Sequence, residues 1–295
     1  MRLLQVAGGD GVARLGIVDG KRALVLKAPY HSITTVLDLL TATEAGRIDG
    51  AKWARDAESA GAFEVVAWED LAAGKTAVRL TMPLTPPEVW GAGVTYRRSA
   101  EFREEGSGIY DKVYAADRPE LFFKATASRC AGPGEPIGKR RDSTFTATEP
   151  ELAIVVGGTG AILGFTVAND VSAWDIEREN PLYLPQSKVY RGCFAFGPVI
   201  VTPDEIPDPY ALEIVCRVER AGREVFRGSA STSQLKRRLP ELVDWLRRSN
   251  DVPAGTILST GTGIIQPLGA GLEEGDVVSI ACPEIGDLRN PVALV

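Results

Sequence analysis

Short apolar runs broken by glycine and proline dominate the hydrophobic pattern of this chain. Near the N-terminus, glycine-containing turns separate three runs that are expected to be strands: Leu3–Val6, Val12–Val18 and Ala23–Leu26. The same region predicts two helices and one more strand: Thr34–Leu40, Lys52–Ala60 and Thr76–Leu80. These elements together predict a small N-terminal α+β domain.

The segment from Thr81 to Trp90 marks the clearest domain boundary. Pro83, Pro86 and Pro87 fall within it, and proline fixes its own φ and disfavours helix in the residue before it. The segment is therefore expected to be extended. We predict a small domain over residues 1–82 and a larger, mostly β catalytic domain over residues 83–295.

Strand patterns continue through the larger region. The expected strands are Leu121–Lys124, Leu152–Val156, Ile162–Val167, Val199–Val201 and Ala211–Val218, and three more lie in TILSTGTGII, LEEGDVVSIAC and IGDLRNPV. Tyr96–Glu105 is expected to be helical or mobile. One stretch, Thr232–Ser249, has helical spacing, and Pro240 within it predicts either a kink or a second helix that starts there.

Composition narrows the functional class. The 295 residues are 44% hydrophobic and 24% charged, with a net charge of −6 and dispersed basic residues, which argues against nucleic acid or an anionic membrane as partner. No apolar run suits a signal peptide or a membrane span, so a cytoplasmic protein is expected. The four cysteines form no CxxC pair, and His31 is the single histidine, which disfavours a zinc site or a histidine-dependent triad.

Glu149-Pro150-Glu151 is the strongest candidate for chemistry. On a strand, residues i and i+2 point to the same face, and Asp170 from the next strand would add a third carboxylate. Three carboxylates suit a hard divalent cation. Pro150 would face the other way, at an edge or bulged position. The alternative is that the two glutamates lie by chance on a solvated strand face.

Lys124, Lys188 and Thr262 each stand where a strand run meets a loop, which is a common place for functional groups. A divalent cation together with three carboxylate ligands has a net charge near −1. An anionic substrate that binds there would therefore need other cations nearby. Lys124 and Lys188 can supply them, although either lysine taken alone is better interpreted as a surface residue.

The ordered motifs PELFFKA, GPGEPI, EPELAIVV, GFTVANDVSAWD, QSKVYRGCFAFGP and GTG resemble the fumarylacetoacetate hydrolase superfamily over about residues 85–295. The resemblance implies a mixed β-sandwich-like roll and a homo-oligomer, either a dimer or a tetramer. It also implies Mg²⁺, or Mn²⁺, held by Glu149, Glu151 and Asp170. Lys188 would then reach the substrate near the metal, and Thr262 would bind the substrate carboxylate.

Departures from the family pattern bear on the reaction. Hydrolytic members carry a His and a Glu after a tyrosine, and here the tyrosine is Tyr96 while those places fall on Ser99 and Phe102. An acidic residue of the family is replaced by Arg191. Without the His–Glu pair, a water-driven cleavage of a carbon–carbon bond loses its general base.

The stretches VYAADRPELFFKAT and ENPLYLPQSK resemble more narrowly the 2-keto-3-deoxy sugar-acid dehydratases, almost end to end but weakly before residue 80. In such a reaction the metal would bind the 2-keto acid and stabilise a developing enolate. Lys188 is the candidate base at C3, and Glu120 is the candidate acid for the C4 hydroxyl. A five-carbon substrate would give 2,5-dioxopentanoate.

Several assignments stay open at this point. Glu120 is equally read as a structural carboxylate paired with Arg118 or another cation. Tyr96, Arg97 and Gln186 are weaker candidates for binding substrate hydroxyls or carboxylate. Alternative functions are an acylpyruvate-type hydrolase or a β-keto acid decarboxylase on the same metal site, and, from another class, a non-catalytic sugar-acid binder.

Overall fold

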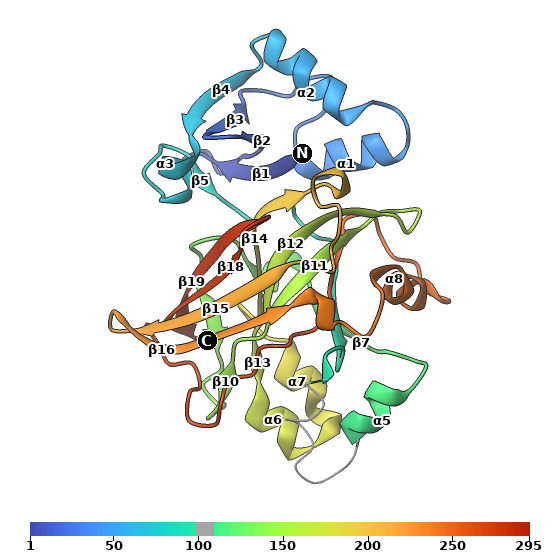
Figure 1. Cartoon of the computed structure of the whole chain (residues 1–295). Coiled ribbons are helices and arrows are strands. Elements are labelled where there is room, and N and C mark those ends of the chain that lie inside the picture. Colours follow the sequence, from blue (N-terminus) through green and yellow to red (C-terminus); the bar gives the residue numbers. More distant parts are fainter. Residues whose placement is uncertain (98–108) are drawn as a thin grey trace.

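The backbone is organised around two β-sheets that pack face to face, with a smaller group of elements at one end (Figure 1). This computed structural model describes residues 1–97 and 109–295. Strands dominate, which confirms the predicted mostly β, α+β class. Ser99 and Phe102, the positions of the missing His–Glu pair, lie outside the described residues.

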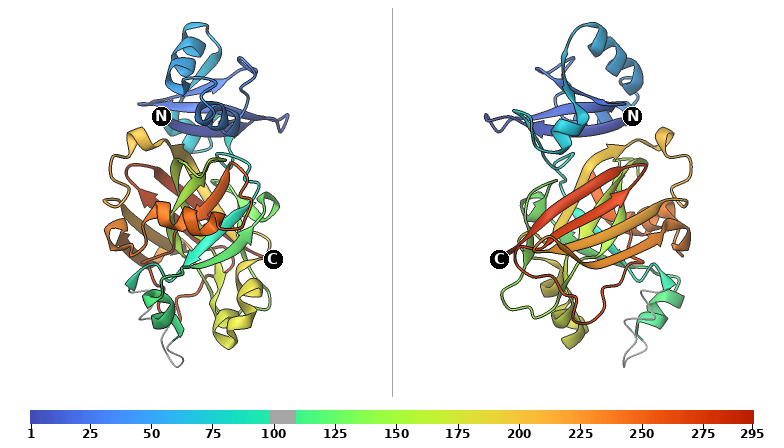
Figure 2. Two further views of the ribbon diagram at one scale, coloured as in Figure 1. Left: turned by 90° about the vertical axis from the view of Figure 1, so that its right-hand side faces the viewer. Right: turned by 60° about the vertical axis from the view of Figure 1, so that its left-hand side comes forward.

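The N-terminal group forms the upper part of the molecule in Figures 1 and 2. Its elements are β1 (Arg2–Ala7), β2 (Ala13–Asp19), β3 (Arg22–Leu26), α1 (Val36–Glu44), α2 (Gly50–Ser59), β4 (Phe63–Ala67), α3 (Trp68–Ala72) and β5 (Arg79–Leu80). The predicted strands and helices are present, although the strand predicted over Thr76–Leu80 is limited to Arg79–Leu80. The Thr35 hydroxyl accepts from the backbone N–H of Asp38 and caps α1. The sequence analysis did not identify β4 and α3.

The larger sheet continues from this group into the rest of the chain. Its other strands are β6 (Val89–Gly93), β7 (Glu120–Ala125), β8 (Cys130–Ala131), β11 (Pro150–Val156), β12 (Ile162–Asp170), β14 (Phe194–Val201) and β17 (Thr256–Ser259). The order is β4-β3-β2-β1-β14-β12-β11-β17-β6-β7, with β5 and β8 off this path. Because Leu3 of β1 pairs with Ile200 of β14, one sheet joins the N-terminal strands to the remainder. The division at residue 82 remains our prediction.

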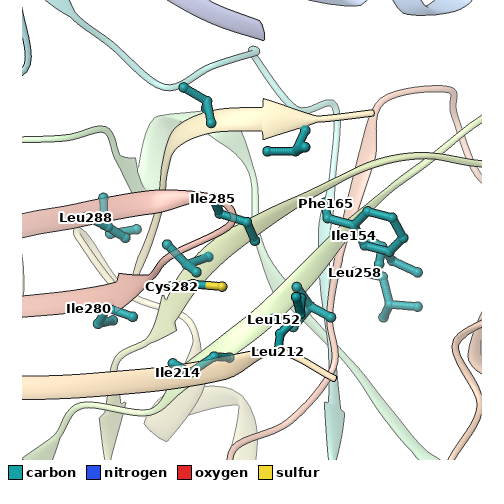
Figure 3. Packing of buried hydrophobic residues seen from close by; sticks show 14 of the residues in the cluster. Leu152, Ile154, Phe165, Leu212, Ile214, Leu258, Ile280, Cys282, Ile285 and Leu288 are labelled. Carbon is teal, nitrogen blue, oxygen red and sulfur yellow. The ribbon is translucent and has the colours of Figure 1, made fainter. Parts of the chain in front are cut away.

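The smaller sheet packs over the centre of the larger one. Its order is β16 (Arg223–Ser231), β15 (Glu213–Arg220), β18 (Val277–Cys282), β19 (Gly286–Leu294) and β9 (Ile137–Lys139). Figure 3 shows side chains of both sheets in the core between them: Leu152 of β11 lies beside Leu212, Ile154 lies beside Phe165 and Leu258, and the smaller sheet contributes Ile214, Ile280 and Cys282. The alternate residues of β11 point to the opposite face and pack in a second core with α1 and α2.

Helical segments connect the strands. They are α5 (Ile109–Ala115), η1 (Ala127–Arg129), α6 (Trp174–Glu179), η2 (Pro181–Tyr183), α7 (Leu184–Lys188), η3 (Pro203–Glu205), η4 (Thr232–Gln234) and α8 (Leu239–Arg247), and a small sheet pairs β10 (Thr146–Ala147) with β13 (Ser172–Ala173). Pro240 stands in the first turn of α8, so the second of the two predicted alternatives holds. None of the helices in the described ranges has the length and apolar character needed to cross a membrane.

Two details of the larger sheet differ from expectation. The predicted strand in TILSTGTGII is limited to β17, because the chain leaves the sheet after Ser259. β11 is an interior strand, whereas an edge or bulged position was predicted for Pro150. The proline is tolerated because it is the first residue of β11 and pairs only with Asn169, since pairing with β17 begins at Ala153.

Candidate metal centre

Three carboxylates lie close together at the edge of the larger sheet where β11 begins and β12 ends. Glu149 immediately precedes β11, Glu151 is the second residue of β11, and Asp170 is the last residue of β12. The backbone N–H of Asp170 donates to the carbonyl of Glu149 at 2.9 Å, which aligns the two strands. All three side chains are buried, and one oxygen from each lies within 4.8 Å of the others. The structure therefore brings the three predicted ligands together.

Neighbouring donors hold one oxygen of each carboxylate. The Trp174 indole N–H donates to Glu149 Oε1, and Lys124 Nζ contacts Asp170 Oδ1 at 2.5 Å. Ser259 Oγ and the N–H of Gly261 both donate to Glu151 Oε2. Such partners fix the orientation of metal-ligating carboxylates.

Lys188 completes the cluster from the end of α7. Its ammonium donates to Glu149 Oε2 at 3.0 Å, to Asp170 Oδ2 at 3.2 Å and to Ser172 Oγ at 2.6 Å. Lys124 is held more deeply, since its side chain is fully buried and its ammonium also donates to the carbonyl of Val171 at 2.8 Å. Both predicted lysines therefore contact the carboxylates.

The close packing of negative charge has an electrostatic consequence for Glu151. Burial raises the pKa of Glu151 to about 8, and repulsion from Asp170 and Glu149 adds to the rise. When no metal ion is bound, these surroundings favour the protonated form of this carboxyl group more than solvent does. A divalent ion in the cluster would favour the ionised form.

A small cavity adjoins the carboxylates. Its walls include Glu120 and Phe122 of β7, Glu177 of α6, Leu184 of α7 and Thr262 of the loop after β17. The volume is about 10 Å³, which is room for about one water molecule. Val94 also lines the cavity at a φ of 52°, and a β-branched residue in that region is strained, as is common at functional sites.

Glycine makes space for the Glu120 side chain. A β-carbon at Gly93 of β6 would fall 2.0 Å from Glu120 Oε2, so the carboxylate of Glu120 lies over bare backbone. Glu120 therefore lines the same cavity as the three carboxylates. Arg118, its alternative structural partner, places its guanidinium carbon 4.5 Å from the centroid of the Trp245 ring.

The three weaker candidates for substrate binding do not line the cavity. Tyr96 is buried beside the cluster, and burial, followed by the charge of Glu151, raises the pKa of its phenol, but the residue does not line the cavity. Arg97 and Gln186 are exposed and also do not line it. The backbone carbonyl of Gln186 instead accepts from Arg140.

Two residues of the site were missed by the sequence analysis. Glu177 is 6% exposed and lines the cavity, and Trp174 holds Glu149. Trp174 lies within the NDVSAWD motif and Glu177 comes two residues after its end, so this motif is the one local signal that pointed toward them. Their spacing within a six-residue helix carries no further information.

The donor set fits a hard divalent cation. Three carboxylates supply oxygen ligands alone, which suits Mg²⁺ or Mn²⁺ over softer metals. Trp174, Lys124 and Gly261 each contact one oxygen of a carboxylate, so the other oxygen is the candidate ligand atom, and Lys188 contacts that oxygen in Glu149 and Asp170. Glu149, Glu151 and Asp170 are therefore the residues that would hold the ion.

Comparison with known proteins identifies relatives. A family model described as fumarylacetoacetate (FAA) hydrolase C-terminal matches residues 88–293. 2-Dehydro-3-deoxy-D-arabinonate dehydratase of Saccharolobus solfataricus is 52% identical over 222 residues, which cover 73% of this chain and 74% of that protein. A probable 2-keto-3-deoxyxylonate dehydratase of Haloferax volcanii is 47% identical over 218 residues, which cover 73% of this chain and 75% of that protein.

A solved structure is similar over the full length. It is 2-keto-3-deoxy-D-arabinonate dehydratase complexed with magnesium and 2,5-dioxopentanoate, which is 40% identical to this chain. The alignment has a TM-score of 0.85 and covers 100% of this chain and 99% of the other.

Proposed function

Because the chain belongs to the fumarylacetoacetate hydrolase family, we propose that it is a Mg²⁺-dependent dehydratase of 2-keto-3-deoxy sugar acids. The proposed reaction converts 2-keto-3-deoxy-D-arabinonate to 2,5-dioxopentanoate and water. The observation that carries this proposal is a buried cavity in which Lys188 meets the carboxylate trio and Glu120 faces the same space. Two relatives named as dehydratases of such acids support it.

Dehydration suits the groups that surround the cavity. A bound Mg²⁺ would polarise the 2-keto acid and make its C3 protons more acidic. Lys188 would take a proton from C3, and a cation nearby favours the neutral amine that this step needs. Glu120 would give a proton to the C4 hydroxyl, which leaves as water. Thr262 would hydrogen-bond the substrate carboxylate.

The position of the single histidine disfavours hydrolysis. His31 packs edge-on against Tyr30, with ring centroids 4.3 Å apart, in the N-terminal group of elements. The cavity walls are formed by residues of the larger region, so this histidine is not available to activate water there.

Product analysis separates the candidate reactions. Purified protein with Mg²⁺ is incubated with 2-keto-3-deoxy-pentonate, and the appearance of 2,5-dioxopentanoate is expected. Release of pyruvate from an acylpyruvate, without dehydration of the sugar acid, would favour the hydrolase alternative. Measurable binding with unchanged substrate would favour a non-catalytic binder.

Replacement of Lys188 by alanine tests its role at C3. We expect kcat to fall by about 10²–10⁴-fold with a smaller change in KM, because the proton is transferred in the transition state. Steady-state kinetics measure both constants. Lys139→Ala removes another buried lysine, which contacts Glu273 and the carbonyl of Leu272, and serves as the control. An unchanged kcat in Lys188→Ala would reject the assignment.

The proposal also extends to assembly and location. A homo-oligomer in the cytoplasm is the arrangement that we propose, supported by the resemblance of the motifs to the family. Light scattering in solution measures the mass, and fractionation of cells that produce the protein gives its location.

A further inference from the structure

The ammonium of Lys188 stands among the oxygens that a metal ion would need. It contacts Glu149 Oε2 and Asp170 Oδ2, while the other oxygens of these two carboxylates accept from Trp174 and Lys124. The inner oxygens are therefore the candidate ligand atoms, and the lysine already uses them.

A lysine ammonium and a divalent cation compete for this position. Both draw on the same oxygen lone pairs, and two positive charges a few ångströms apart in a buried site repel each other strongly. We therefore expect a metal ion that binds the inner oxygens to displace the ammonium group.

Lys188, unlike Lys124, has partners outside the three carboxylates that its ammonium group could move toward. The ammonium of Lys124 is fixed by Asp170 Oδ1 and by a backbone carbonyl. Lys188 reaches the trio from the cavity wall, and two of its partners are outside the trio: Ser172 Oγ at 2.6 Å and Glu177 Oε2 at 3.9 Å. Ser187 Oγ lies 3.4 Å from the same Glu177 oxygen and donates to it.

We propose that Lys188 occupies the metal position in the metal-free protein, and that metal binding moves its ammonium onto Glu177. Glu177 is then the positioning residue that holds Lys188 beside the cavity when the metal is present. The exchange compensates the buried carboxylates in both states, by the lysine in one and by the metal in the other. This inference rests on the proposed ligand set of Glu149, Glu151 and Asp170.

Calorimetric titration of the full chain with MgCl₂ at fixed pH tests the exchange. Lys188→Met should bind Mg²⁺ about tenfold more tightly than the wild type, because the competing ammonium is gone. Lys139→Met should leave the Kd unchanged. An unchanged or weaker affinity in Lys188→Met would overturn the proposal.

A ligand variant separates this outcome from failure of the metal site. Glu151→Gln removes a proposed ligand and should abolish Mg²⁺ binding. If Glu151→Gln binds normally, the ligand set is wrong. If it does not bind and Lys188→Met is unchanged, the ligand set stands and the exchange is rejected.

A double-mutant cycle tests Glu177. Glu177→Gln should weaken Mg²⁺ binding by about threefold in the wild type, because the displaced lysine loses its acceptor, and should have no effect in the Lys188→Met background. An equal loss in both backgrounds would mean that Glu177 acts through its own charge, and would reject the positioning role.

Thermal denaturation supplies an independent measurement. Lys188→Met should have a lower Tm than the wild type in EDTA, since the buried carboxylates lose a cation, and a larger rise in Tm on addition of Mg²⁺. If Lys188→Met does not fold without Mg²⁺, Lys188→Gln keeps a hydrogen-bond donor without the charge and carries the same expectations. An equal rise in the variant and the wild type would contradict the exchange.

Discussion

At the scale of single residues, hydrogen-bond donors around the carboxylates set the orientation of the proposed metal ligands. Trp174→Phe keeps an aromatic ring but removes the N–H that holds Glu149 Oε1. We expect Mg²⁺ affinity to fall about 10–100-fold, as is typical when a partner of a metal ligand is lost. Calorimetric titration measures this, and Trp245→Phe, at a tryptophan that stacks with Arg118 and Arg248, is the control. Equal affinity in the Trp174 variant and the wild type would show that the N–H does not matter.

The raised pKa of Glu151 predicts how stability depends on pH. In metal-free protein the folded state keeps the proton up to about pH 8, whereas the unfolded chain releases it near its ordinary value of 4.5. The stabilising contribution of this group is therefore complete below about pH 4.5 and is lost as the pH rises through about 8. Mg²⁺ reverses the trend, because it binds the ionised carboxylate and should raise Tm more at higher pH.

Thermal denaturation in EDTA and in MgCl₂ across this pH range checks both expectations. Glu151→Gln removes the titrating group, so its metal-free Tm should depend less on pH than that of the wild type. A metal-free stability that increases between pH 5 and pH 8 to the same extent in both proteins would contradict the assignment.

Single residues also show what the sequence could predict. Glu149, Glu151 and Asp170 were identified because strand periodicity and a short hairpin place them together. Glu177 was not identified, because it enters the cavity through a short helix and a turn whose path depends on tertiary packing. The exposed Arg97 and Gln186 were chosen for residue type alone, and the direction of a side chain on an irregular segment cannot be read from its neighbours in sequence.

At the scale of elements, the turn after β17 fixes the position of Glu151. Gly261 donates its N–H to Glu151 and adopts a φ of 93°, and a β-carbon there would fall 1.9 Å from Thr95 Oγ1. Gly261→Ala should destabilise the protein by at least about 2 kcal/mol and weaken Mg²⁺ binding, since it adds a clash to an unfavourable φ. Denaturant unfolding and titration measure the two effects.

Gly269 provides the matched control for that substitution. Its φ is 92°, and nothing lies within 4 Å of the position of a β-carbon, so Gly269→Ala tests the backbone conformation without the clash. We expect a loss of about 1 kcal/mol and no change in Mg²⁺ binding. Equal effects in the two variants would show that crowding at Gly261 is unimportant.

The success of the element predictions follows the strength of local signals. β1, β2 and β3 were predicted because apolar runs alternate with glycine turns, and α8 was predicted from its helical spacing. β16 was missed because Val225 and its exposed neighbours give an edge strand little apolar pattern. Local sequence therefore located these elements where the apolar pattern was strong and missed β16 where it was weak.

At the scale of the whole molecule, the N-terminal strand β1 pairs with β14 in the larger sheet and so helps to stabilise it. Every residue of β14 is buried, and its pairing with β1 places Leu3 beside Ile200. We expect a fragment of residues 83–295 to have a lower Tm than the full chain and to self-associate, because an apolar strand edge becomes exposed. Thermal denaturation and size-exclusion chromatography with light scattering test this. A fragment as stable and as soluble as the full chain would show that the two predicted domains are independent.

The small volume of the cavity has a consequence for how substrate enters the site and product leaves it. Room for about one water molecule matches the water that each proposed turnover releases, but not the five-carbon acid that must arrive or the aldehyde that must depart. Binding of the acid at the carboxylates is therefore expected to require that side chains of the cavity wall move apart. Glu177, Leu184 and Lys188 line the cavity from one short segment, so a shift of that segment would widen the space beside the carboxylates and move the proposed proton acceptor at the same time.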